Sequence, residues 1–175
     1  MRWTAVAVLL ASLLVGTASA QAASKGFRAK AVNWAVGQDG HRENGTTNCS
    51  KRINRWQRAM GFGVPPCRPW CGALVHQAFL RAGVRLSRRL IDPHKAYADA
   101  VARRRKLKRI SVSKVGPGDL VFFKFRSGVR ASHLAIVRDR PWGGRVSTME
   151  GNVAHRAVRT TRRTSDVVLA ARVVP

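Results

Sequence analysis

The stretch PPCRPWCGALVHQAFLRAGV, residues 65–84, places two cysteines four residues apart at the head of an apolar helical pattern. Its apolar residues recur at the spacing of one helix face, which predicts a helix from about Trp70 to Ala82. Gly83 follows the last residue of this pattern and is typical of a helix end. The stretch therefore predicts a helix that begins directly at a cysteine.

The cysteine at this helix start, Cys71, has the position of a reactive thiol. The chain has three cysteines, so one thiol stays free if any two of them form a disulfide. The positive end of the helix dipole and the free N–H groups at a helix start both favour the thiolate, which is the nucleophilic form. The alternative is that Cys71 is only a small hydrophobic residue in the core, as most buried free cysteines are.

The first 20 residues, MRWTAVAVLLASLLVGTASA, have the features of a secretory signal peptide. An arginine near the start precedes an apolar run from Ala5 to Val15, and small residues at positions 18–20 form a cleavage site. The alternative is an uncleaved membrane anchor, for which the apolar run is short. We predict a signal peptide in residues 1–20 and one soluble, exported domain in residues 21–175, which is long enough to build a hydrophobic core.

The composition is strongly basic. Lysine and arginine number 33 against 8 aspartates and glutamates, for a formal net charge of +25. Such a charge attracts polyanions, and for an exported chain we expect envelope polyanions rather than nucleic acid. The alternative is a solvated, arginine-rich surface that reflects composition alone. The densest basic run, Arg103 to Arg109, follows a helical pattern and is predicted to be the solvent-facing end of that helix.

Helical patterns fill the first half of the chain. Residues 25–38 place apolar side chains on one helix face. A second helix is predicted with Asn48 or Ser50 as its N-cap and Gly61 as its stop. The Cys71 helix is the third, and a fourth is predicted to begin after Pro93.

The second half changes to short apolar stretches separated by turns. VGPGDLVFFKF (115–125) is a Pro-Gly turn that leads into a strand. SHLAIVRDR (132–140) and RVSTMEGNV (145–153) are further strands on either side of a PWGG hairpin turn. Residues 155–163 and 166–174 complete four or five short strands. Helices followed by an antiparallel sheet predict an α+β fold.

Three polar residues in the predicted strands can complete a site around Cys71. His133 opens an apolar strand, and an imidazole can pair with a cysteine and later protonate a leaving amine. Such an imidazole needs a third group to fix its orientation. Glu150 and Asn152 lie two positions apart on one strand, so we expect both side chains on the same face. One would orient His133 while the other binds substrate or an oxyanion. Each residue alone is weak evidence, and their order along the chain is stronger.

At this point the sequence resembles a known family. The segments RPWCGALVHQAFLRAGV, VGPGDLVFFKF, SHLAIV and STMEGN are similar, in this order, to the motifs of the CHAP domain, the cysteine, histidine-dependent amidohydrolase/peptidase. The upstream segment ENGTTNCSKRINRW resembles the Glu…Asn…Lys lead-in of that family. The resemblance spans roughly Phe27 to Val174. It implies a papain-like α+β fold, in which the nucleophile helix packs on a small antiparallel sheet.

The resemblance also implies a site and an activity. Cys71 would be the nucleophile, His133 the base and acid, Glu150 the orienting carboxylate and Asn152 a polar helper. Residues 21–175 would form a CHAP-type catalytic domain that cleaves amide bonds of peptidoglycan. The protein would be secreted, either extracellular or associated with the cell wall. We expect a monomer whose basic surface is attracted to anionic wall polymers.

Two features depart from the family pattern. Cys67 is not a family hallmark, and residues 36–44 supply only Asp39 and Glu43 where some phage members carry a calcium loop, so we predict no metal and no other cofactor. Export permits disulfides, and a Cys49–Cys67 bond would leave Cys71 free. A zinc site that uses Cys67, Cys71 and a histidine, or a Cys67–Cys71 redox pair, are the alternatives.

Two other functions compete with the leading one. The first is that of the NlpC-type endopeptidases, which share the cysteine helix and a similar GDLVFF strand. That group usually has Asp-Cys-Ser-Gly around the nucleophile, whereas this chain has Trp70-Cys71-Gly72-Ala73. The second is a non-catalytic, cationic envelope-binding protein. Neither the bond that is cut nor the origin of the wall, the host's own or a competitor's, follows from the sequence.

Overall fold

One antiparallel sheet of six strands, in the order β1-β6-β2-β3-β4-β5, organises the molecule. The computed structural model describes residues 26–175, so the signal peptide predicted for residues 1–20 lies outside the described residues. The strands are β1 Leu107–Ile110, β2 Leu120–Phe123, β3 His133–Val137, β4 Arg145–Val153, β5 Arg156–Arg163 and β6 Val167–Val173. The sequence predicted four or five strands, and β1 is the strand that it missed.

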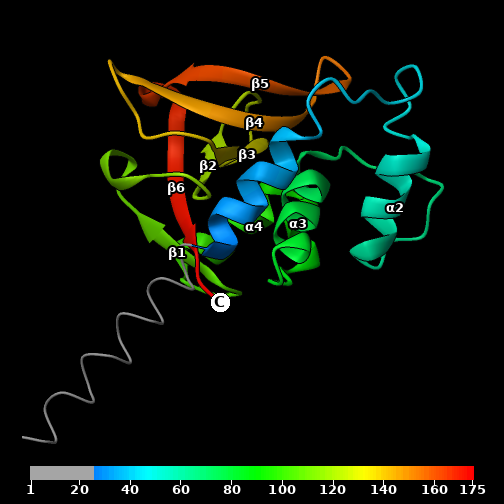
Figure 1. Cartoon of the computed structure of the whole chain (residues 1–175), viewed down its shortest axis with the longest axis horizontal. Helices are drawn as coiled ribbons and strands as arrows, with labels where there is room; N and C mark the ends of the chain where they lie inside the picture. The colour runs from blue at the N-terminus through cyan, green and yellow to red at the C-terminus, as the bar shows by residue number, and fades with distance from the viewer. Residues whose placement is uncertain (1–25) are drawn as a thin grey trace, which may run out of the picture.

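Within residues 26–175, four helices accompany the sheet. They are residues 26–36, α2 Lys51–Ala59, α3 Cys71–Arg81 and α4 Pro93–Val101. Single 3-10 turns occur at η1 Arg88–Ile91, η2 Val112–Lys114 and η3 Thr164–Asp166. Figure 1 shows α3 between the sheet and the outer helix α2, and α3 contacts both β3 and β4. None of the helices within residues 26–175 is long and apolar enough to cross a membrane.

Local sequence explains where the helices begin. The hydroxyl of Ser50 accepts a hydrogen bond from the backbone N–H of Ile53, which caps α2 as predicted. Asp92 caps α4 in the same way, and Pro93 takes the first helical position, where no N–H is needed. Gly61, with φ of +83°, ends the α2 segment in a conformation that glycine adopts without strain.

The basic run Arg103 to Arg109 is not the end of a helix. Helix α4 ends at Val101, and Arg103, Arg105 and Lys106 take left-handed backbone conformations that a helix cannot contain. The chain then enters β1, where Leu107 is buried while Lys108 and Arg109 are exposed. Burial of Leu107 against the helices, together with pairing to β6, outweighs the helical pattern of the charges.

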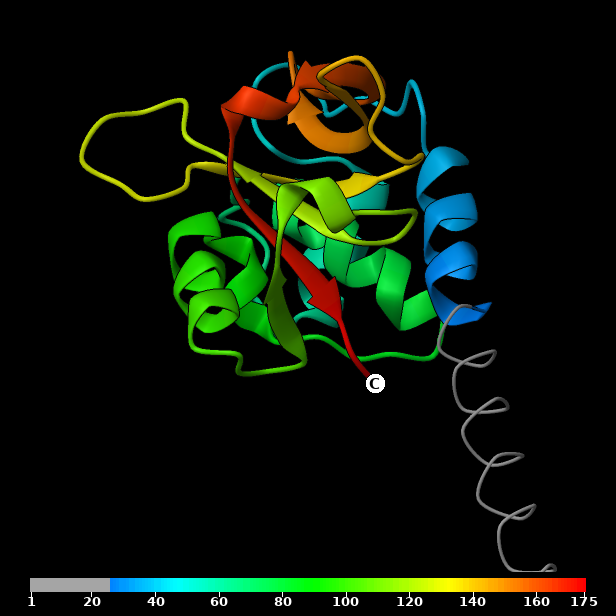
Figure 2. The ribbon, with the colours of Figure 1, turned by 90° about the vertical axis from the view of Figure 1, so that its left-hand side faces the viewer.

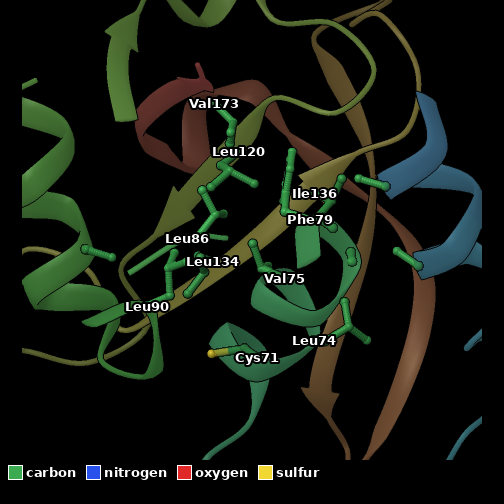
Figure 3. Close-up of a cluster of buried hydrophobic side chains, with 14 of the residues drawn as sticks. Cys71, Leu74, Val75, Phe79, Leu86, Leu90, Leu120, Leu134, Ile136 and Val173 are labelled. Atoms are coloured by element: carbon green, nitrogen blue, oxygen red, sulfur yellow. The ribbon is translucent and has the colours of Figure 1, made fainter. Parts of the chain in front are cut away.

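The sheet is covered by apolar side chains on both faces. Alternation along β2 sends Leu120 and Phe122 toward the helices, and Val121 and Phe123 to the other face. The larger cluster, on the helix side, contains Phe79, Leu134 and Ile136, and Figure 3 shows Cys71 at its edge. The head of α3 and the start of β3 therefore meet where the core ends. Figure 2 shows the β2–β3 loop, residues 124–132, extending away from this body.

Candidate active site

Cys71 is the first residue of α3 and is buried, with a free thiol. Two glycines allow other segments to approach it closely. A Cβ on Gly72 would overlap the carbonyl group of Leu90, so η1 packs directly against the start of α3. A Cβ on Gly151 would lie 2.9 Å from the ring of Trp70, the residue before Cys71. Because neither Gly72 nor Gly151 has a side chain, η1 and β4 can both pack closely around the start of α3, where Cys71 lies.

His133 and Glu150 form a buried pair beside this thiol. The Nε2 atom of His133 lies 2.9 Å from Oε2 of Glu150, and Glu150 is fully buried. The Cys71 side chain also interacts with His133. Because Nε2 faces Glu150, Nδ1 is the ring nitrogen left for the thiol. The three residues therefore form a connected series from thiol to imidazole to carboxylate.

Glu150 is itself held by Arg162 and Thr148. The guanidinium of Arg162 donates to both carboxylate oxygens, at 2.9 Å from Nε and 2.7 Å from Nη2. The hydroxyl of Thr148 donates to Oε1 at 2.7 Å. Together with His133, these groups supply four hydrogen bonds to one buried carboxylate. The bidentate geometry fixes the carboxylate plane, which in turn fixes the ring of His133.

The electrostatics favour a charged imidazole. Burial is the largest single effect on the pKa of His133 and acts to lower it, but the hydrogen bonds and charges of Cys71 and Glu150 together outweigh burial and raise the pKa to about 9. Burial acts to raise the pKa of Glu150, but the hydrogen bonds from His133 and Arg162 lower it to about 2. At neutral pH the site therefore holds an imidazolium and a carboxylate.

The regular alternation from which we predicted Glu150 and Asn152 on one face of β4 does not hold at Asn152. The register between β4 and β5 shifts between Glu150 and Val153, and Asn152 has φ of +64°. A bulge adds a residue and breaks the simple alternation of side chains. The Nδ2 atom of Asn152 donates to Oδ1 of Asn48 at 3.1 Å. Glu150 is thus the residue that orients His133, and Asn152 joins β4 to the loop before α2.

The disulfide prediction is confirmed: Cys49 and Cys67 are bonded, and their Cα atoms lie 5.6 Å apart. Because Cys67 is used in this bond, a zinc site that needs its thiolate and a Cys67–Cys71 pair are both excluded. The buried side chain of Gln57 reinforces the same region by bonding both the N–H and the carbonyl of Arg68. The segment that leads into Cys71 is therefore tied to α2.

Glu43 is a second buried carboxylate near the site. Its Oε2 accepts a hydrogen bond from the indole N–H of Trp70 at 3.0 Å, and its Oε1 pairs with Nδ1 of His155. Glu43 thereby links the residue before Cys71 to the β4–β5 turn. In the sequence, Glu43 belongs to the Glu…Asn…Lys lead-in and is one of too few calcium ligands, but nothing in the local pattern shows that it accepts a hydrogen bond from Trp70.

The aromatic rings of Phe123 and Phe125 lie beside the ring of His133. The rings of Phe123 and Phe125 stack with centroids 5.6 Å apart and planes within 6°. The centroid of Phe125 lies 5.7 Å from that of the His133 ring. The guanidinium of Arg162 lies over both phenyl rings, 5.7 Å from the centroid of Phe123 and 5.3 Å from that of Phe125. Buried Phe123 and exposed Phe125 thus both border the ring of His133.

Four residues of this region were not found from the sequence as site residues: Arg162, Thr148, Phe125 and Glu43. A signal for Arg162 lies in the β4–β5 register, which pairs Thr148 with Thr160 and Val146 with Arg162. This pairing puts Arg162 on the same face as Thr148 and Glu150, within reach of a long side chain.

Comparison with known proteins supports the fold. No protein-family model matches the chain, and no curated protein matches its sequence. A solved structure from Staphylococcus aureus subsp. aureus Mu50, described as similar to a lipoprotein of the NLP/P60 family, aligns with a TM-score of 0.51 and 18% identity. The alignment covers 85% of this chain and 42% of that one, so this chain spans less than half of that protein's length.

A second structure, that of Ly7917, aligns with a TM-score of 0.45 and 17% identity, over 83% of this chain and 62% of that one. Identities this low show a shared fold and nothing more, and only the first match is close enough to show it. The predicted papain-like α+β fold is confirmed. Its cysteine helix, packed on an antiparallel sheet, is the arrangement found here for α3, β3 and β4.

Proposed function

We propose that this protein is a cysteine hydrolase that cleaves amide bonds in peptidoglycan. The observation that carries the proposal is the connected series Cys71–His133–Glu150, in which Arg162 holds the last member. A free thiol at a helix start, a charged imidazole beside it and a fixed carboxylate behind it are the parts that nucleophilic amide cleavage requires. A protein that only bound the wall would need none of these contacts.

In the first step the sulfur of Cys71 attacks the carbonyl carbon of the amide, and the carbonyl oxygen takes the negative charge. His133 then gives its proton to the leaving nitrogen, the C–N bond breaks, and a thioester with Cys71 remains. Glu150 stabilises the imidazolium before this transfer and keeps Nδ1 directed at the thiol.

In the second step the neutral His133 takes a proton from water while the water oxygen attacks the thioester carbon. The C–S bond breaks, the carboxylic acid product leaves, and the proton taken from water stays on His133 beside the released sulfur of Cys71. The two steps together consume one water molecule and regenerate the enzyme.

The substrate class rests on the resemblance to CHAP domains and on three further properties. A disulfide such as Cys49–Cys67 persists in oxidising compartments outside the cytoplasm. The net charge of +25 favours anionic surroundings such as wall polymers. The NLP/P60 neighbour is described as similar to a lipoprotein, and lipoproteins are attached to membranes. These properties support a secreted enzyme that acts at the cell envelope.

The test compares wall lysis by the wild-type protein with lysis by Cys71→Ala and Cys71→Ser. Both variants are expected to lose turbidity-clearing activity while they keep the far-UV circular dichroism and thermal unfolding of the wild type. Full clearing by Cys71→Ala would refute the enzyme proposal and favour the cationic binding protein.

Mass spectrometry of the fragments released from purified peptidoglycan separates the two enzymatic candidates. Release of intact stem peptides from the glycan indicates an amidase. Cleavage within the peptides indicates an endopeptidase, the activity of the NlpC-type alternative.

A further inference from the structure

Phe125 is an exposed aromatic residue at the edge of the candidate active site. It is the second residue of the β2–β3 loop, and 54% of its surface is exposed. A single exposed phenyl ring is not by itself a sign of an interaction site, but burying its apolar surface against a ligand is favourable, and its position beside a candidate catalytic group gives it a ligand to bind. The neighbouring group here is His133, whose ring centroid lies 5.7 Å from that of Phe125.

The ring of Phe125 is held in place rather than free to turn into the core. One contact is the parallel stacking on buried Phe123. The backbone N–H of Phe125 donates to the hydroxyl of Ser132 at 2.7 Å, and the N–H of Ser132 donates to the carbonyl of Phe123 at 2.9 Å. These bonds close the base of the 124–132 loop. The ring is therefore presented to solvent at a fixed position beside His133.

The exposure of Phe125 has a natural comparison elsewhere in the chain. Among residues 26–175, the other exposed large aromatic residue is Trp142, of which 56% is exposed. Trp142 lies in the β3–β4 turn. Because β3 and β4 are antiparallel, this turn is at the opposite end of β3 from His133. Trp142 has the same exposure without the neighbouring site, which makes it a matched control.

We propose that Phe125 is a substrate-contacting residue that binds an apolar CH surface next to the scissile amide. The inference rests on the proposed function, because it assigns a subsite to that reaction. In peptidoglycan such a CH surface comes from two sources: the pyranose ring of the glycan, or the aliphatic side chains of the stem peptide. Removal of the ring weakens substrate binding and leaves the chemistry at Cys71 in place.

The experiment measures kcat and KM for Phe125→Ala, Phe125→Trp and Trp142→Ala. The two substrates are a soluble muropeptide that keeps its sugars and the same stem peptide without them. For Phe125→Ala we expect KM to rise about tenfold, which corresponds to about 1.4 kcal/mol of lost binding. We expect kcat to stay within about twofold, since the interaction is made equally in ground and transition states. Phe125→Trp keeps an aromatic face and restores KM, and Trp142→Ala matches the wild type.

The pattern across the two substrates identifies the group that is bound. A rise in KM confined to the muropeptide assigns the ring of Phe125 to the glycan, and an equal rise with both substrates assigns it to the peptide. An unchanged KM overturns the proposal. So does a fall in kcat with a displaced alkaline limb of the pH profile, because the ring would then act only through His133. Failure of the proposed function looks different: the wild-type protein would turn over neither substrate.

Discussion

Replacing Glu150 by glutamine removes one charge and changes almost no volume. The wild-type carboxylate accepts four hydrogen bonds, from His133, from Thr148 and twice from Arg162. A glutamine has one oxygen and one NH2 group, so in either orientation its NH2 faces groups that also donate. The substitution therefore leaves buried donors without an acceptor and leaves the charge of Arg162 uncompensated.

The magnitude follows from burial and from the pKa of His133. Loss of one member of a buried ion pair destabilises a protein by about 3–5 kcal/mol. The rise in the pKa of His133 from 6.5 to about 9 corresponds to about 3 kcal/mol, which Cys71 and Glu150 supply jointly against the effect of burial. We expect Glu150→Gln to lower the free energy of unfolding by about 3 kcal/mol at pH 6. We also expect a lower kcat and an alkaline limb of the activity profile that moves to lower pH.

The sign of the effect gives a pH window. The folded-state pKa of Glu150 is lowered from 4.5 to about 2, so its contribution is complete above pH 4.5 and is lost as pH falls toward 2. The folded-state pKa of His133 is raised, so its contribution is complete below pH 6.5 and is lost as pH rises through 9. The stability difference between wild type and Glu150→Gln is therefore largest between pH 4.5 and 6.5.

Urea unfolding at a series of pH values, together with kcat/KM on a soluble muropeptide, measures both effects. Wild-type activity is expected to fall above pH 9, where the imidazolium loses its proton. The reasoning is refuted if Glu150→Gln keeps the wild-type alkaline limb and loses less than about 1 kcal/mol, the range of an exposed ion pair.

Three further predictions concern other parts of the chain. His133→Ala should abolish activity, whereas His76→Ala should keep kcat and lower only the melting temperature. The reason is that His76 is buried and that this burial is the main cause that lowers its pKa to about 4. The reverse ranking of the two variants in a turbidity assay would exclude His133 as the base. Ordinary overpacking of a core costs about 1–3 kcal/mol, and Gly72→Ala should destabilise the protein by more, since its Cβ meets the backbone of η1. Gly63→Ala is the control: its Cβ meets nothing within 4 Å, so thermal unfolding should stay unchanged. Binding of an inactive variant to whole walls should fall steeply as salt rises above 0.1 M, where charges are screened within about 10 Å. Neutralising residues 103–105 should also reduce this binding. Binding that persists in high salt would indicate a specific pocket instead.

The parts of the site that local sequence determines were predicted, and the contacts between distant strands were not. The helix start at Cys71, the strand start at His133 and the Ser50 cap each depend on a few neighbouring residues. The bulge after Glu150 depends on how β4 and β5 align, so the direction of Asn152 could not be read from the spacing of two residues. Pattern alone gives side-chain faces correctly only where a strand stays regular.

The prediction for the basic run Arg103 to Arg109 was wrong for a related reason. A run such as RRRKLKR fits a solvated helix and a solvated edge strand equally well, and the single buried residue, Leu107, decides between them. In the structure Arg162 pairs with Glu150, and Arg159 pairs with Asp39. Which arginines of a strongly basic chain stay available for a polyanion depends on where its few carboxylates lie.

The two outer strands of the sheet are β1 and β5, and both carry this positive charge. Lys108 and Arg109 are exposed on β1, and Arg156, Arg159 and Arg163 are exposed on β5. An unpaired strand edge can take up a strand from another molecule and start aggregation, and charged side chains along the edge oppose this. Residues 40–43 already pair with the start of β5, and a second copy that added its β1 to the β1 edge would bring like charges together. The residues that would attract this protein to an anionic wall therefore also keep its copies from joining edge to edge.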